Sequence, residues 1–132
     1  MKASKLNIGL WAAQILLALL FGMAGFMKLT MPIPDLAAMM AWPGNVPVSL
    51  VRFIGFAELA GAIGVILPAL TKIKPHLTPL AAAGFTIIQV LAVPVHIFQG
   101  DIAMMAPINA GLLGLALFVI WGRWKALPVT SK

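Results

Sequence analysis

Few residues of this sequence could take part in chemistry, and six of them lie within or beside long apolar segments. The six are Lys28, Arg52, Glu58, Gln89, His96 and Asn109. A carboxylate in the middle of a membrane helix costs about 2.5–3.5 kcal/mol on insertion scales, so Glu58 is expected to face other helices and to have a partner. Lys28 is the natural partner, because Arg52 is rotated by about 120° from Glu58 around the helix that they share. We interpret the six residues as candidate ligand-binding residues.

Two compatible roles are open for Glu58. One is a structural clasp with Lys28 that fixes how two helices pack. The other is a proton-linked or ligand-binding carboxylate. Its helical neighbours Gly55 and Gly61 are small, which would let other helices approach closely.

His96 also has two interpretations. Pro94, two residues before His96, cannot donate a helical hydrogen bond, so we expect a kink there. Together with Gln89, this kink could shape a small polar pocket. The alternative is an interfacial histidine hydrated among the lipid head groups.

Nothing in the sequence predicts catalysis. Ser4, Ser49 and Ser131 have no histidine and acid in a recognisable pattern, and the carboxylates Asp35 and Asp101 fall in expected loops. The chain has no cysteine, which excludes disulfide exchange and thiolate metal sites. We therefore expect no catalytic residue, no metal site and no activity of the chain on its own.

The elements that must position these residues are membrane helices. In a chain of 132 residues, 62% are hydrophobic and 9% charged, with a mean hydropathy of +1.06. These values exclude an ordinary soluble domain. Four apolar runs are long enough to span a bilayer, at about 7–28, 50–70, 78–98 and 102–121. We expect one membrane domain over 1–132, an all-α, integral membrane four-helix bundle, with a short helix on the outer membrane surface inside loop 30–48.

The loop charges predict the orientation. Seven cations fall on one side of a four-span arrangement: Lys2, Lys5, Lys72, Lys74, Arg123, Lys125 and Lys132. Two fall on the other side, Lys28 and Arg52. Cations accumulate on the cytoplasmic side of membrane proteins, so both termini are expected in the cytoplasm of a bacterial-type inner membrane. The same placement explains the net charge of +6 without a nucleic acid partner.

In this orientation, the six polar residues gather in the outer half of the bundle, and the inner half has only Gln14 and Thr86. All methionines except Met1 also lie toward the outer side. Thioethers select Cu(I), but adaptable packing around an apolar ligand is the commoner role of methionine. His76 and His96 lie on opposite sides, so they cannot ligate one haem.

Three segments carry a family resemblance. Residues 24–29, AGFMKL, resemble the AG-x-x-K-L signature of DoxX-like membrane proteins. Residues 53–68, FIGFAELAGAIGVILP, are similar to the second helix of that family, and residues 77–84, LTPLAAAG, with the later His96, are similar to its third. The resemblance implies a four-helix membrane bundle like that of quinone-linked enzymes. Family members include a subunit of a quinone oxidoreductase and assembly chaperones of membrane receptors. The family's arginine and glutamate after the histidine are replaced here by Gln99 and Asp101.

The first functional hypothesis is an accessory subunit of a quinone-linked membrane redox complex, which binds a quinone-like or lipid ligand. The first alternative is an assembly factor whose loop 30–48 contacts another membrane protein. The second is a small transporter that uses Glu58 as its coupling acid. Small-residue spacings such as that of Ala57 and Gly61 could serve packing within the bundle or between copies in a homo-oligomer, and we expect packing within it.

Overall fold

The computed structural model describes residues 2–131, which form helices joined by short connections, without a β-strand among them. The helices are α1 (Lys2–Thr30), α2 (Ile33–Met40), the 3₁₀ turn η1 (Trp42–Asn45), α3 (Val48–Thr71), α4 (Leu77–Gln99), α5 (Ile102–Trp121) and the π-helical turn η2 (Gly122–Ala126). Four segments are long and apolar enough to cross a membrane, with window hydropathies of 1.9–2.0. The predicted all-α membrane bundle is confirmed, and α2 is the short helix expected between the first two spans.

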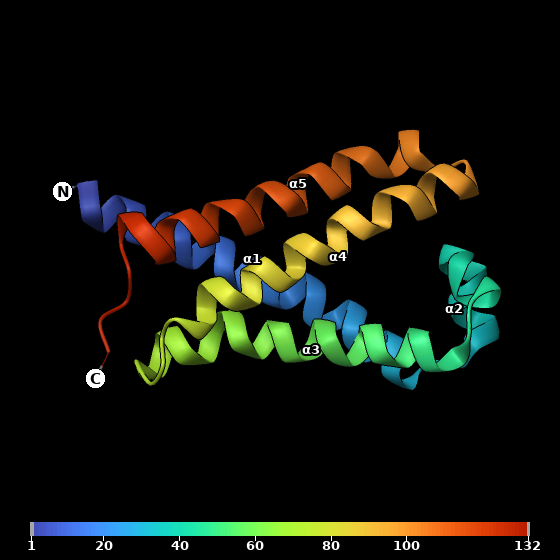
Figure 1. The fold of residues 1–132 in the computed structure, drawn as a ribbon, viewed down its shortest axis with the longest axis horizontal. Coiled ribbons are helices and arrows are strands. Elements are labelled where there is room, and N and C mark those ends of the chain that lie inside the picture. The colour runs from blue at the N-terminus through green and yellow to red at the C-terminus, as the bar shows by residue number, and fades with distance from the viewer. Residues whose placement is uncertain (1, 132) are drawn as a thin grey trace.

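The four long helices are arranged as a fork (Figure 1). One arm is α1 with α3, and the other is the α4–α5 hairpin. The arms meet at the end that carries both chain termini, called here the termini end, and diverge toward the end that carries α2, called the α2 end. The arms are therefore packed together over only part of their length.

The core lies where the arms meet. The Phe21 and Phe85 rings stack across the arms, with centroids 4.0 Å apart. Around them lie small and branched side chains from all four long helices, namely Ala13, Leu17, Val65, Ala82, Ala116 and Val119. The outward faces carry exposed apolar residues such as Leu19, Phe56 and Ile87, as expected for surfaces that contact lipid.

Two glycines let α1 and α3 touch through their backbones. A Cβ on Gly25 would lie 2.6 Å from the carbonyl oxygen of Gly55, and a Cβ on Gly55 would lie 2.7 Å from the Cβ of Lys28. Side-chain carbons do not approach so closely, so only glycine fits either position. This crossing fixes the relative height of Lys28 on α1 and Glu58 on α3.

The turn between α4 and α5 is made by Gly100. Its φ of 81° is in the left-handed region, where glycine carries no steric penalty. Its amide donates to the carbonyls of His96 and Ile97 in the last turn of α4, and the Asp101 amide also donates to the His96 carbonyl. The chain then reverses directly into α5, so Asp101 lies close to the last turn of α4.

Candidate functional site

An ion pair joins α1 and α3 just beyond the glycine crossing. The Lys28 Nζ donates to the Glu58 Oε1 at 2.7 Å. The two residues are 7% and 3% exposed. The partner that the sequence predicts for Glu58 is thus confirmed. A buried carboxylate and a buried ammonium each carry a large desolvation cost, and their direct contact offsets it.

On the side that faces the α2 end of the molecule, an aromatic ring covers this ion pair. The Trp42 ring of η1 lies over Lys28, with the Nζ 5.9 Å from the ring centroid.

Arg52 has a different role, because its Nη1 donates to the carbonyls of Lys28 and Met31, at 2.8 Å each. Arg52 thereby satisfies carbonyls at the end of α1 and is not aimed at Glu58, in agreement with its predicted rotation around α3.

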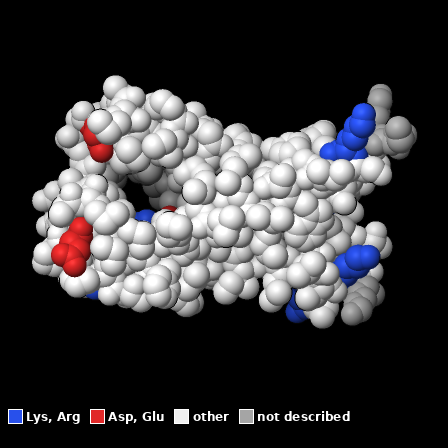
Figure 2. All heavy atoms as spheres, turned by 180° about the vertical axis from the view of Figure 1, so that it is seen from behind, with Lys and Arg blue, Asp and Glu red and all other residues white. Residues whose placement is uncertain are grey.

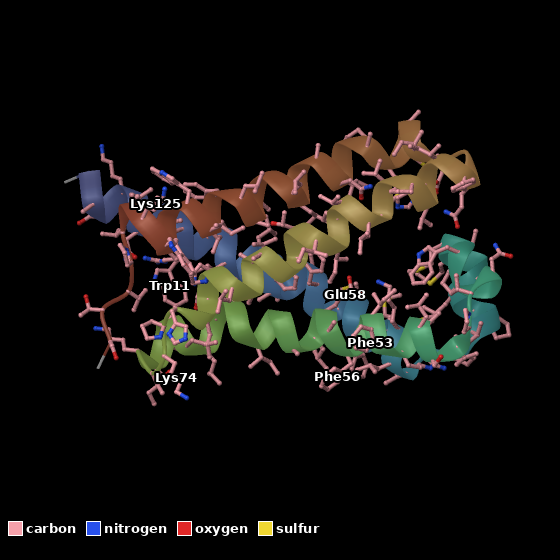
Figure 3. All side chains as sticks on the ribbon, in the orientation of Figure 1. Trp11, Phe53, Phe56, Glu58, Lys74 and Lys125 are labelled. Carbon is pink, nitrogen blue, oxygen red and sulfur yellow. The ribbon has the colours of Figure 1, made fainter. Side chains whose placement is uncertain are left out.

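The arms begin to part at the level of Glu58. Phe85 of α4 packs against Gly61 of α3, since a Cβ added to Gly61 would lie 2.5 Å from the Phe85 ring. Measured along the helices toward the α2 end, Glu58 lies about 4.5 Å beyond Gly61, and Gln89 lies about 6 Å beyond Phe85. Glu58 and Gln89 therefore lie at a similar depth on opposite arms. Figure 3 shows Glu58 on the side of α3 that faces α4, and Phe56 on the opposite side.

A hollow opens beyond this level. The space-filling view shows the molecule deeply indented near the α2 end, with basic and acidic atoms visible at the bottom of the indentation (Figure 2). The stacked pair of Phe21 and Phe85 lies on the termini side of this level. The hollow is thus closed toward the termini end by aromatic packing and lined at its base by the Lys28–Glu58 pair.

Three amide side chains have a buried oxygen or nitrogen without a hydrogen-bond partner, namely Gln99 at the α4–α5 turn, Gln89 and Asn109. Gln89 is 7% exposed and Asn109 is 9% exposed, yet the Gln89 Oε1 and the Asn109 Nδ2 have no hydrogen-bond partner. A buried polar atom without a partner costs about 1–3 kcal/mol. In Gln89 and Asn109, one acceptor on α4 and one donor on α5 are therefore left without a hydrogen bond.

His96 belongs to a separate cluster at the α4–α5 turn. Its Nδ1 lies 2.9 Å from the Asp101 Oδ1, and the Gln99 Nε2 donates to the Asp101 Oδ2 at 3.4 Å. Partial desolvation raises the pKa of Asp101, but the hydrogen bonds from His96 and Gln99 lower it more, so that this pKa lies below its usual value. The contacts of His96 hold the turn together.

A second polar centre, which the sequence did not predict, lies at the termini end. Arg123, placed there among the loop cations, is 5% exposed. Its Nε donates to the Gln14 Oε1 at 2.7 Å and its Nη2 to the Asn7 Oδ1 at 2.9 Å. The Nη1 donates to the Leu127 carbonyl at 3.1 Å. The only sequence signal was Gln14, an amide in an apolar helix whose partner could not be named.

Gln14 connects this centre to α3. Its Nε2 donates to the Val65 carbonyl at 2.8 Å while its Oε1 accepts from Arg123. Arg123 also lies 5.7 Å from the centroid of the Trp11 ring. One guanidinium thus ties together α1, η2 and the C-terminal tail, and through Gln14 it also reaches α3.

Comparison with known proteins identifies the family. The model of the DoxX-like family matches residues 12–119. The chain belongs to the DoxX-like family. No curated protein and no solved structure matches the chain. The matched range of this DoxX-like protein includes the Lys28–Glu58 pair, Gln89 and Asn109, and it ends before Arg123.

Metal binding has little support from the geometry of the DoxX-like chain. Across residues 2–131, no group of three or more His, Asp or Glu side chains could hold a metal ion. The polar groups at the depth of Glu58 are an ammonium, a carboxylate and, on α4, the amide of Gln89, which between them can donate to and accept from organic oxygen atoms.

Proposed function

We propose that this DoxX-like protein binds the polar head group of a quinone or a similar amphiphilic lipid in the hollow, as a small subunit of a membrane redox complex. The observation that carries the proposal is the buried Lys28–Glu58 pair at the base of a hollow, at the depth where Gln89 has an unused acceptor. Buried charged and polar groups inside a membrane protein are costly and are typical of functional sites.

The hydrogen-bonding groups match both redox forms of a quinone. The Lys28 ammonium has three donors, of which one is used by Glu58, so it can donate to a carbonyl oxygen. The Gln89 Oε1 and the Glu58 carboxylate can accept from a hydroxyl group. A bound quinone would supply the redox chemistry by taking up two electrons and two protons. The side chains would bind and orient the ring, and Glu58 could hold a proton beside it.

The open side of the fork suits an apolar tail. Toward the α2 end, α4 and α5 expose the side chains of Val90, Leu91, Val95, Ile97, Met104 and Ile108. A tail that leaves the hollow between the arms would therefore pass from apolar side chains directly into lipid. This arrangement favours an amphiphile over a fully polar substrate.

The charge distribution supports an outward-facing hollow. The termini end carries Lys5, Lys72, Lys74 and Lys125, whereas Asp35 and Asp101 lie near the α2 end. By the positive-inside rule the termini end would face the cytoplasm of a bacterial-type membrane. The hollow would then open toward the outer side.

The packing favours a closed pocket over a transport path. The Phe21–Phe85 stack and the core around it fill the bundle below the hollow. The assembly-factor alternative predicts a protein in place of a small ligand between the arms, and the same experiment tests it.

The experiment is native mass spectrometry of the gently extracted full chain, with solvent extraction of its bound small molecules. We expect one quinone or other redox lipid per chain, and reduced retention in Glu58→Gln. Gln89→Leu is the sharper variant, because it removes a buried unpaired atom. It should raise thermal stability while lowering ligand retention, which a general folding defect would not do.

The matched control is Phe56→Leu, two residues from Glu58 but on the lipid-facing side of α3. It should retain the ligand fully. Absence of a small ligand together with a stoichiometric partner protein would overturn the proposal in favour of an assembly factor. Glu58-dependent proton flux in liposomes would overturn it in favour of a transporter.

A further inference from the structure

Within residues 2–131, Arg123 is a buried cation without an acidic partner. The chain has three acidic side chains. Glu58 pairs with Lys28, Asp101 pairs with His96, and Asp35 lies in α2 at the opposite end. The three hydrogen bonds of the Arg123 guanidinium go to neutral oxygens. A guanidinium has five N–H donors, so two remain beyond those three bonds, and its charge is not compensated by a carboxylate side chain.

Two clefts flank this guanidinium. The first has a volume of about 420 Å³ and is lined by Lys74, His76, Arg123, Trp124 and Ser131, among others. The second has a volume of about 630 Å³, and its lining includes Ser4, Asn7, Trp11, Lys72 and Arg123. Pro128 and Val129 line both clefts, so the C-terminal tail separates them. Arg123 is the cation that both clefts share.

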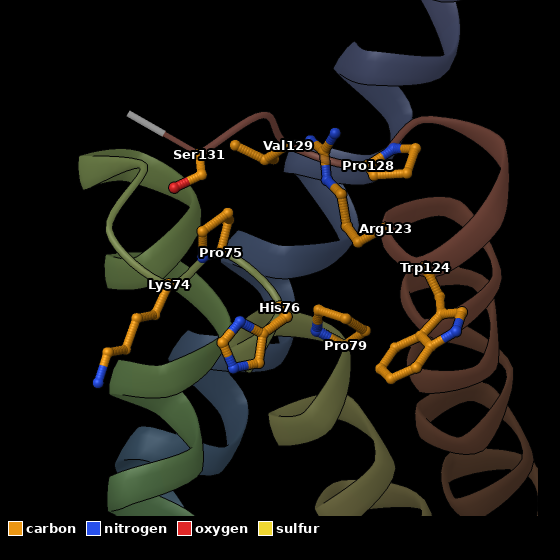
Figure 4. Close-up of a pocket in the computed structure, with 9 residues that line it drawn as sticks. All are labelled: Lys74, Pro75, His76, Pro79, Arg123, Trp124, Pro128, Val129 and Ser131. Carbon is orange, nitrogen blue, oxygen red and sulfur yellow. The ribbon is translucent and has the colours of Figure 1, made fainter.

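Figure 4 shows the first cleft in detail. Arg123 extends from η2 toward the tail at Pro128 and Val129, and the ring of His76, on the α3–α4 connection, lies between Lys74 and Pro79 in this view. Lys74 lies at the rim, with its side chain directed away from Arg123 in this view. Because the lysine stem is flexible, its ammonium can turn toward an anion bound to Arg123.

We propose that the second cleft, at the termini end, binds a phosphate group through Arg123, with Lys72 of the same cleft and Lys74, two residues further along the chain, as supporting cations. A guanidinium can donate two parallel hydrogen bonds to a phosphate, and the Ser4 hydroxyl of the same cleft can add a further donor. Basic pockets at the ends of membrane helices typically hold anionic lipid head groups. The apolar lining residues Leu70 and Leu127 of the second cleft suit the glycerol and acyl region of such a lipid. The same chemistry would also bind free phosphate, and the experiment separates these two sources.

The experiment measures binding to the purified full chain in a neutral detergent. Phosphatidylglycerol, phosphatidylcholine and inorganic phosphate are titrated separately, with native mass spectrometry and thermal stability as readouts. We expect phosphatidylglycerol to bind most tightly. Lys72→Gln/Lys74→Gln should weaken it roughly thirtyfold, since each cation near a lipid head group contributes about 1 kcal/mol.

The control is Lys5→Gln/Lys125→Gln. It removes the same charge at the same end, but neither residue lines a cleft, so affinity should change less than threefold. Arg123→Lys keeps the charge and loses the planar donor pair, and should weaken binding although the protein remains folded. Binding of inorganic phosphate alone, with the same pattern of variants, would support the phosphate site and assign it to a soluble anion.

Equal losses in the two lysine pairs, or no binding of either probe, would overturn the proposal, because diffuse surface charge would then explain any attraction. Glu58→Gln should not change phosphate binding, since Glu58 lies in the hollow near the α2 end. This independence separates a failure of the phosphate site from a failure of the head-group site in the hollow.

Discussion

Lys28 and Arg123 are both buried cations, and their surroundings differ in charge. Lys28 contacts the Glu58 carboxylate and the Trp42 ring. Arg123 contacts neutral oxygens and the Trp11 ring. A carboxylate compensates the charge of its partner, whereas neutral oxygens satisfy donors and leave a positive potential. The first cation therefore belongs to a neutral pair, and the second leaves a positive potential at the termini end, which is the basis of the proposed phosphate site.

Removing one member of the Lys28–Glu58 pair should destabilise the protein more than removing both charges. Lys28→Met leaves a buried carboxylate without its cation and is expected to cost about 3 kcal/mol. Lys28→Met/Glu58→Gln removes both charges and should lie within about 1 kcal/mol of the parent. The measurement is thermal unfolding in detergent. Equal losses in the single and double variants would show that the pair is not coupled.

The turn cluster predicts a dependence of stability on pH. Hydrogen bonds from His96 and Gln99 hold the pKa of Asp101 below its usual value. The ionised carboxylate therefore stabilises the folded state above the ordinary aspartate pKa of about 4. This stabilisation is lost as the pH falls through the lowered pKa of the folded state.

Asp101→Asn should remove that part of the acid transition, so the stability difference between parent and variant should shrink from pH 7 to pH 3. Thermal unfolding across this range measures it. Asp35→Asn is the control, because Asp35 is an exposed carboxylate of α2. A constant difference between parent and Asp101→Asn across the range would contradict the proposed role of the cluster.

At the level of helices, contact between α1 and α3 depends on backbone approach. The four membrane helices are apolar on nearly every face, so a hydrophobic stripe does not mark the packed side. Small residues mark it instead, because they let helices approach closely in lipid. Gly25 and Gly55 do so at the level of the ion pair, which explains why a glycine precedes Lys28 by three residues in the AG-x-x-K-L segment.

Gly25→Ala should destabilise the protein by about 1–3 kcal/mol, the usual range for overpacking. Its Cβ would lie 2.6 Å from the Gly55 oxygen and 2.7 Å from the Leu59 nitrogen, so the helices would have to separate. Gly84→Ala and Gly114→Ala are matched controls, because nothing lies within 4 Å of either added Cβ. Thermal unfolding in detergent compares the three, and a loss in the controls equal to that of Gly25→Ala would rule out the crossing as the cause.

The sequence was sufficient for the helices and for one part of the site. An acid in an apolar helix requires a partner, and Lys28 was the cation aimed at Glu58. The cluster of His96 with Asp101 was not predicted, because depth along a helix says nothing about what the following turn brings near. Arg123 was missed for a related reason. A cation after the last span satisfies the positive-inside rule whether it reaches water or folds back, and here η2 folds it back onto Gln14.

For the whole molecule, the fork separates two sites of opposite character. The base of the hollow holds an internally neutral ion pair with unused amide atoms, near the α2 end. The termini end holds an uncompensated guanidinium with lysines around it. Two such ends suit a protein whose hollow takes a head group from one side of the bilayer while its cationic end is anchored at the other. This arrangement depends on the orientation of the chain.

Single cysteines can measure that orientation, because the chain has none of its own. Ser4→Cys and Ala126→Cys place exposed thiols at the termini end, and Asn45→Cys and Ser49→Cys place them at the α2 end. Lys5, Lys72, Lys74, Arg123 and Lys125 lie at the termini end, and Lys28 and Arg52 lie toward the α2 end, so the positive-inside rule predicts a cytoplasmic termini end. A membrane-impermeant maleimide should therefore label Asn45→Cys and Ser49→Cys in intact bacterial cells, and the other two only after permeabilisation. The reverse pattern would show that the hollow opens toward the cytoplasm, and any ligand would then have to come from the inner leaflet.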